Sequence, residues 1–138
     1  MQGKRSLSFK KLKPLSNFDI EDAAREIPHF RGVFMRDGLP SGIENTECGV
    51  LNLDAGSGGG THWVAYWKDG PAAIYFDSYG LDPPKEILDY LSRSAIAIRA
   101  QTFQLQEADD VICGHLCLHV LWELTAGRQF EDIVLSLV

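Results

Sequence analysis

The sequence predicts an α+β fold in one domain. At 138 residues the chain has the size of a single domain and can bury a core without disulfide bonds. Its hydrophobic and charged fractions, 45% and 23%, are those of a globular protein. Helix-type and strand-type patterns follow one another as helix, strands, helix, strand and helix. We therefore expect one layer of helices packed against a mainly antiparallel sheet.

The first half of the chain predicts a helix followed by a hairpin of strands. Ser16 or Asn17 can cap the helix, and acidic side chains fill its first turn. The strands are runs of apolar and aromatic residues that Gly-rich or Asp-Gly segments separate. In chain order, the expected elements are a helix over 16–27, a turn over 30–40, and strands over 48–54, 62–67 and 72–80.

The second half predicts two helices, one strand and a last element of either type. Asp82 precedes two prolines, which suit the first turn of a helix over 83–94. Alternating Ile residues predict a strand over 95–106. An apolar run that stops at Gly127 predicts a long, buried helix over 113–127. Residues 130–138 fit either a helix or a strand.

Charge is unevenly distributed along the chain. Residues 1–13 hold five basic side chains and no acid, although the whole chain has a net charge of −6. We predict that residues 1–15 form a basic, solvated tail and that residues 16–138 form the folded domain. The acidic domain is a poor surface for nucleic acid, so contact with nucleic acid is expected only through the tail.

The cysteine count and the apolar segments indicate where the chain resides. Three cysteines cannot form a complete set of disulfides, and the N-terminus has no leader-like apolar run. A reducing, intracellular compartment is therefore expected. No segment approaches the roughly 20 apolar residues of a membrane span, so no membrane partner is expected.

Two cysteines and two histidines within residues 113–119 raise the question of metal binding. On a helix, Cys113 and Cys117 share one face, and His115 and His119 share another about 200° away. Four ligands on two faces of one helix do not converge on a tetrahedral ion, and the chain has no Cys-x2-Cys pair to complete a site. No metal site is predicted.

Cys113 differs from the other cysteines in its position. It stands in the first turn of the expected helix, where free backbone N–H groups and the helix dipole stabilise a thiolate. Cys48 and Cys117 have no such advantage and are interpreted as buried core residues. Cys113 is therefore the candidate nucleophile, and the alternative is an apolar core helix without chemistry.

A nucleophilic thiol needs a base, a group that orients the base and an oxyanion donor. His62 begins one expected strand and Asp77 ends the next. An antiparallel hairpin would bring both to one edge, facing Cys113. The candidate oxyanion donors are Gln106, seven residues before the cysteine, and its neighbours Gln104 and Gln101.

Taken together, the segments GGGTHWVAYW, YFDSYG and CGHLCLHVLWEL, with Gln106, resemble the adenovirus endoprotease (adenain) family. The family pattern is Gly-Gly-x-His-Trp, an acid before a Gly-containing turn, Gln, and then Cys-Gly. Every part occurs here in that order, with the Gln seven residues before the Cys. The resemblance runs from about Ser16 to Leu137. It is closer still to the adenain-like proteases of Maverick/Polinton elements and adintovirus-like genomes, which residues 30–40 and 47–54 also resemble.

The resemblance implies a papain-like cysteine protease fold of the adenain/ubiquitin-like-protease type, with the nucleophile at the start of a central helix. Cys113 is then the nucleophile, and His62 is the general base or the imidazolium of an ion pair. Asp77 orients His62, where adenain has Glu. Gln106 and the backbone N–H of Cys113 form the oxyanion hole. Trp63 either walls a narrow substrate groove or packs in the core.

The implied function is a cysteine endopeptidase that processes virus-like structural precursor proteins at Gly-containing sites, so the expected partner is a protein or peptide substrate. The chemistry requires no cofactor. The resemblance adds an activating peptide or nucleic acid, although the acidic domain departs from basic adenain. The alternatives are a deubiquitinase- or deSUMOylase-like isopeptidase and a catalytically idle binding remnant. The implied location is the host cytoplasm or nucleus, or the virion.

Overall fold

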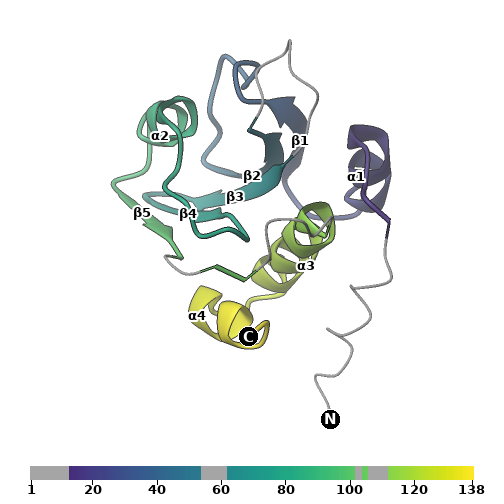
Figure 1. Cartoon of the computed structure of the whole chain (residues 1–138). Coiled ribbons are helices and arrows are strands. Elements are labelled where there is room, and N and C mark those ends of the chain that lie inside the picture. Colours follow the sequence, from purple (N-terminus) through teal and green to yellow (C-terminus); the bar gives the residue numbers. More distant parts are fainter. Residues whose placement is uncertain (1–12, 54–61, 102–103, 106–111) are drawn as a thin grey trace.

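The computed structural model describes residues 13–53, 62–101, 104–105 and 112–138, which form a five-stranded sheet and four helices (Figure 1). The strands lie in the sheet in the same order as in the chain. None of the helices in these ranges is long and apolar enough to cross a membrane. The elements are α1 (Asn17–Ala23), β1 (Phe30–Met35), β2 (Thr46–Asn52), β3 (Trp63–Asp69), β4 (Ala72–Phe76), α2 (Lys85–Leu91), β5 (Ala97–Ala100), α3 (Cys113–Thr125) and α4 (Phe130–Leu135).

The predicted α+β class is confirmed, but the sheet is mixed rather than mainly antiparallel. The pairs β2–β3 and β3–β4 are antiparallel, and the short Asp-Gly turn predicts the second of them. The outer strands β1 and β5 instead join β2 and β4 in parallel. The expected turn over residues 30–40 is wrong for its first six residues, which form β1. A parallel strand pair is not joined by a tight hairpin turn, so the local sequence gives little sign of it.

Helices cover both faces of the sheet, where a single layer was expected. Helices α1, α3 and α4 pack on one face, and α2 packs on the other (Figure 1). Strand β2 serves both cores because successive side chains point to opposite faces. Val50 belongs to the core beneath α3, and Leu51 belongs to the core beneath α2.

Local signals explain the helix boundaries. A reciprocal capping box opens α1, with the Ser16 hydroxyl accepting from the Asp19 N–H at 3.1 Å and the Asp19 carboxylate accepting from the Ser16 N–H at 3.0 Å. Helix α3 spans 13 residues and is followed by Gly127 at φ +95°, a conformation that favours glycine. Residues 130–138, which fit either type, contain helix α4.

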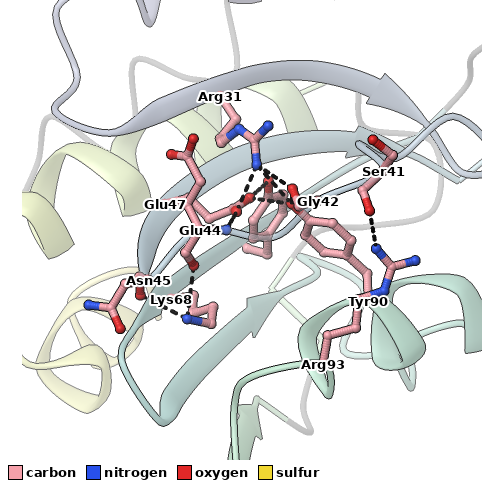
Figure 2. Close-up of polar contacts among 10 residues, drawn as sticks. Arg31, Ser41, Gly42, Glu44, Asn45, Glu47, Lys68, Tyr90 and Arg93 are labelled. Carbon is pink, nitrogen blue, oxygen red and sulfur yellow. Dashed lines mark hydrogen bonds and ion pairs between the residues drawn. The ribbon is translucent and has the colours of Figure 1, made fainter.

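A buried carboxylate anchors the segment that leads into β2 (Figure 2). Glu47 is fully buried, and its Oε1 accepts from the hydroxyls of Tyr66 and Tyr90 at 2.6 and 2.7 Å. Its Oε2 accepts from Arg31 Nη1 at 3.0 Å and from the Glu44 N–H at 2.7 Å. Burial alone would raise the pKa of Glu47, but these four donors lower it below its usual value.

A buried lysine holds the same segment from the neighbouring strand. Lys68 pairs with Glu47 in the β2–β3 register and is also fully buried. Its Nζ donates to the carbonyl oxygens of Glu44 and Asn45 at 3.0 and 2.8 Å. At a strand rise of about 3.3 Å per residue, Lys68 lies roughly 20 Å along β3 from His62. This polar network therefore occupies the end of the sheet remote from His62.

Candidate active site

His62 and Asp77 meet at one end of the β3–β4 hairpin. His62 directly precedes β3 and Asp77 directly follows β4, so antiparallel pairing places them at the same end. His62 Nε2 lies 2.7 Å from Asp77 Oδ1, and both side chains are buried. The structure thus brings together the two residues that the sequence singled out, while their catalytic roles stay predictions.

Cys113 joins this pair from the first residue of α3. The backbone N–H of Trp63 donates to its Sγ at 3.4 Å, and the cysteine is only 6% exposed. The second ring nitrogen of His62, Nδ1, is buried and makes no hydrogen bond of ordinary geometry with any described residue. The thiol of Cys113 nevertheless interacts closely enough with the ring to shift the pKa of both groups. One nitrogen is therefore committed to Asp77, and the other is left for the thiol.

The surroundings of His62 and Cys113 favour a thiolate–imidazolium pair. Burial opposes the charged imidazole, but the hydrogen bond to Asp77 and the contact with Cys113 raise the pKa of His62 to about 9. Burial would raise the pKa of the Cys113 thiol, but His62 and the N–H groups of Trp63 and Gly114 lower it. The N-terminus of α3 acts in the same direction.

The other two cysteines lack these features, and their interpretation as core residues is confirmed. Cys48 and Cys117 are both fully buried in the core beneath α3. Burial raises the pKa of Cys48 to about 12 and raises that of Cys117 well above its usual value. Of the three thiols, only Cys113 is activated by its surroundings.

Asp77 is held by its own turn and by Gln101. The N–H of Tyr79 donates to Asp77 Oδ1 at 2.8 Å, the same oxygen that meets His62. The Gln101 amide bonds both backbone groups of Asp77, donating to its carbonyl oxygen and accepting from its N–H at 3.4 Å. Gln101 was an alternative candidate for the oxyanion hole, but its side-chain amide is hydrogen-bonded to the backbone of Asp77. Asp77 Oδ2 is buried and meets no donor among the described residues.

Gln106 lies outside the described residues, so its role as oxyanion donor stays a prediction. Of its neighbours, Gln104 is exposed. The N–H of Leu105 donates to the carbonyl oxygen of Ser78 at 2.7 Å. That hydrogen bond connects Leu105 to the turn that follows Asp77.

Trp63 packs between the N-terminal segment and α3. It is 6% exposed, and its indole N–H donates to the carbonyl oxygen of Leu15 at 3.1 Å. A Cβ added to Gly114 would lie 3.3 Å from Leu15, Ile20 and Trp63 alike, which is tighter than normal packing. Gly114 thus lets three elements close around the start of α3. These contacts are those of a core residue, and a role for Trp63 in walling a substrate groove stays a prediction.

Tyr79 is a neighbour of His62 that the sequence reasoning missed. Its ring stacks on the imidazole with the two ring centroids 4.0 Å apart and the planes 8° from parallel. The available signal was its place two residues after Asp77, where an Asp side chain commonly binds the backbone of its own turn. This type of turn predicts the backbone position of Tyr79, but it does not predict that the ring stacks on His62.

The described residues contain no group of three or more His, Cys, Asp or Glu placed to hold a metal ion. On α3, His115 instead donates from Nε2 to the carbonyl oxygen of Lys13 at 2.8 Å. The chemistry that this arrangement can support is nucleophilic attack by the thiolate, with the imidazolium as the proton donor.

Comparisons with known proteins support the fold. No protein-family model matches the chain, and no curated protein sequence matches it. Two crystal structures of the ASFV pS273R protease are similar to it. One is 25% identical, covers 65% of this chain and 38% of its own, and gives a TM-score of 0.55. The other is 18% identical, covers 91% of this chain and 62% of its own, and gives a TM-score of 0.60.

The chain spans less than two thirds of the length of either viral protease chain that it resembles. The fold is therefore the α+β fold of papain-like cysteine proteases of the adenain/ubiquitin-like-protease type, as the sequence predicted.

Proposed function

We propose that the protein is a cysteine endopeptidase of the adenain type. The main observation in support of the proposal is that the side chains of His62, Asp77 and Cys113 lie together. His62 is bonded to Asp77 through one ring nitrogen and interacts with the Cys113 thiol at the start of α3. The opposite pKa shifts of Cys113 and His62 support the same assignment, because they favour the reactive thiolate near neutral pH.

In the proposed reaction, the Cys113 thiolate attacks a peptide carbonyl and the carbonyl oxygen becomes an oxyanion. The backbone N–H of Cys113 and the side chain of Gln106 stabilise that charge. The His62 imidazolium protonates the leaving amine, the C–N bond breaks, and an acyl thioester remains on Cys113. Water then attacks the thioester with His62 as the base, the C–S bond breaks, and the acid leaves while the Cys113 thiolate and the His62 imidazolium are regenerated. Asp77 keeps the imidazole oriented throughout.

The proposed substrates are structural precursor proteins of a virus or virus-like element, cut at Gly-containing sites. Two observations support this class. The sequence resembles adenain-like proteases, most closely those of Maverick/Polinton and adintovirus-like genomes, and the fold resembles the ASFV pS273R protease. The same proposal includes a location in the host cytoplasm, nucleus or virion and activation by a peptide or by nucleic acid, with the basic N-terminus as the only expected contact for nucleic acid.

The first test is alkylation of the folded protein by iodoacetamide between about pH 5 and 9, with each cysteine quantified by mass spectrometry. Cys113 should react fastest and should keep its rate at pH 6, with Cys48 and Cys117 as internal controls. His62→Gln should abolish the advantage of Cys113. If all three thiols react slowly and with ordinary pH dependence, the isolated chain has no assembled nucleophile and the idle binding module replaces the endopeptidase.

A second test separates endopeptidase from isopeptidase. The folded chain is offered an internally quenched peptide with a Gly-containing site and, in parallel, a ubiquitin-like protein carrying a fluorogenic amide on its C-terminus. Cys113→Ser is the negative control. Faster turnover of the peptide supports the proposal, whereas turnover of the ubiquitin-like substrate alone replaces it with the isopeptidase.

A further inference from the structure

We propose that Tyr79 is a positioning residue, which holds the imidazole of His62 between Asp77 and Cys113 and stabilises its protonated form by ring stacking. The inference rests on the proposed protease function and adds a residue to its site. Its basis is the face-to-face contact of the two rings, with centroids 4.0 Å apart and an angle of 8° between the planes.

The stack supplies a restraint that the other contacts of His62 lack. The hydrogen bond to Asp77 fixes Nε2 at 2.7 Å from Oδ1, but a single bond lets the ring rotate about it. A flat ring against one face of the imidazole removes that rotation. Nδ1 then stays on the side of the Cys113 thiol, where a proton can pass between the two groups.

Tyr79 is itself held firmly enough to act in this way. Its N–H donates to Asp77 Oδ1 at 2.8 Å, and the turn closes with the Gly80 N–H donating to the Asp77 carbonyl oxygen, also at 2.8 Å. Gly80 has φ +74°, a conformation in which glycine is favoured. Gln101 and Leu105 bind the backbone of the same turn. One short turn therefore carries both the carboxylate and the aromatic ring to His62.

The chemistry of the stack favours the imidazolium. An aromatic face carries partial negative charge and attracts a cation that lies against it, and the attraction grows when water is excluded. Among the described residues, the charged or ionisable groups that shift the pKa of His62 are Asp77, from the end of β4, and Cys113, from α3. Tyr79 acts through its ring face rather than through a charge, so its effect is separable from theirs by substitution.

The test compares Tyr79→Leu, which removes the ring, with Tyr79→Phe, which keeps the ring and loses only the hydroxyl. The pKa of His62 is followed by NMR titration of protein with labelled histidine, and Cys113 alkylation is measured at pH 6. We expect Tyr79→Leu to lower the pKa of His62 and to slow alkylation by about 10-fold, and Tyr79→Phe to stay within about 2-fold of the starting protein. Tyr79→Met is the second ring-free variant in case Tyr79→Leu does not fold.

Three outcomes would overturn the assignment. The pKa of His62 could be unchanged in both ring-free variants, or alkylation could be as fast as in the starting protein, and either result removes the positioning role. A loss in Tyr79→Phe as large as that in Tyr79→Leu would assign the effect to the hydroxyl and not to the stack. Failure of the proposed function is distinguishable, because it shows as slow Cys113 alkylation in the unsubstituted protein, while the NMR titration still decides whether the ring acts on His62.

Discussion

Glu47 and Asp77 are both buried carboxylates on the same sheet, and the structure uses them in opposite ways. Glu47 receives four donors, two on each oxygen. Asp77 uses Oδ1 for His62 and for the N–H of Tyr79, while Oδ2 meets no donor among the described residues. A fully satisfied buried carboxylate fixes the chain around it, whereas a buried carboxylate oxygen without a donor costs stability. The fully satisfied carboxylate lies at one end of the sheet, and the predicted catalytic residues lie at the other.

Glu47 and Asp77 also differ in their cationic partners. Glu47 faces Arg31. Burial opposes the charged guanidinium, but the hydrogen bond to Glu47 and its charge raise the pKa of Arg31, which stays charged. Asp77 faces His62, an imidazole that can lose its proton, with a pKa raised to about 9. Only the second pair can take up and release a proton during a reaction. Four substitutions or changes of condition test this contrast, beginning with the largest expected effect.

Removal of the Asp77 carboxylate should act on catalysis far more than on folding. Asp77→Ala leaves His62 Nε2 without its acceptor, and we expect peptide hydrolysis to fall by roughly 10²- to 10⁴-fold. Asp77→Asn keeps an acceptor oxygen without the charge, so it should retain part of the rate and lower the pKa of His62. Hydrolysis rates and urea denaturation are measured on the same preparations. An active but strongly destabilised Asp77→Ala protein would contradict the contrast.

Neutralisation of Glu47 should have the reverse effect. Glu47→Gln leaves the buried side of Arg31 uncompensated and turns an amide N–H₂ toward groups that donate, so we expect a loss of about 3–5 kcal/mol in the free energy of unfolding. Cys113 alkylation in the folded fraction should not change. The matched control is Glu86→Gln, which breaks a half-exposed ion pair with Arg36 and should cost less than about 1 kcal/mol. Equal losses in the two variants would remove Glu47 from its anchoring role.

A methyl group can disturb the same network without touching a charge. A Cβ on Gly49 would lie 2.8 Å from Cε1 of Tyr66, the residue opposite it in the β2–β3 register. Because the Tyr66 hydroxyl is bonded to Glu47, the ring cannot retreat freely, and Gly49→Ala should lower the free energy of unfolding by about 1–3 kcal/mol. Gly42→Ala is the control, since a Cβ there has no atom within 4 Å. A neutral Gly49→Ala would mean that the Tyr66 ring is not fixed by Glu47.

The pH dependence of the free energy of unfolding should also separate the two pairs. His62 has a pKa of about 9 in the folded chain against an ordinary value of 6.5, so its contribution is complete below about pH 6.5 and is lost as the pH rises through 9. Glu47 has a lowered pKa, so its contribution is present above its ordinary 4.5 and is lost only as the pH falls through the folded value. Denaturation curves from about pH 2 to about pH 10 should lose the alkaline decline in His62→Gln and the acidic one in Glu47→Gln. If His62→Gln retains the full alkaline decline, other groups cause it.

Much of the fold follows from local signals, and the misses have a physical cause. The Ser16 cap, the Asp-Gly turn after β3 and the apolar run of α3 each depend on neighbouring residues and were predicted. Strand β1 was missed because its pairing partner is β2, with which it shares no tight turn. Glu47 and Lys68 indicate an exposed strand face when read alone, since charges are rarely buried unpaired. Their partners come from several segments that only the folded chain brings together.

The candidate site likewise contains contacts that local sequence predicts and contacts that form only in the folded chain. The meeting of His62 and Asp77 follows from hairpin geometry, and the place of Cys113 follows from the onset of an apolar helix. The Gln101 contact and the Tyr79 stack depend on side-chain positions in a turn, which no periodic pattern encodes. The oxyanion role of Gln106 stays a prediction from the family pattern.

The order of the site residues along the chain has a consequence for when the chemistry can begin. His62 and Asp77 are 15 positions apart within a tight hairpin, whereas Trp63 and Cys113, which meet at the thiol, are 50 positions apart. Local contacts form sooner than distant ones, and synthesis delivers the hairpin before α3. A nascent chain can therefore pair His62 with Asp77 before it has Cys113, the predicted nucleophile. The order of the residues along the chain thus delays the predicted thiolate until the hairpin that carries His62 and Asp77 has formed.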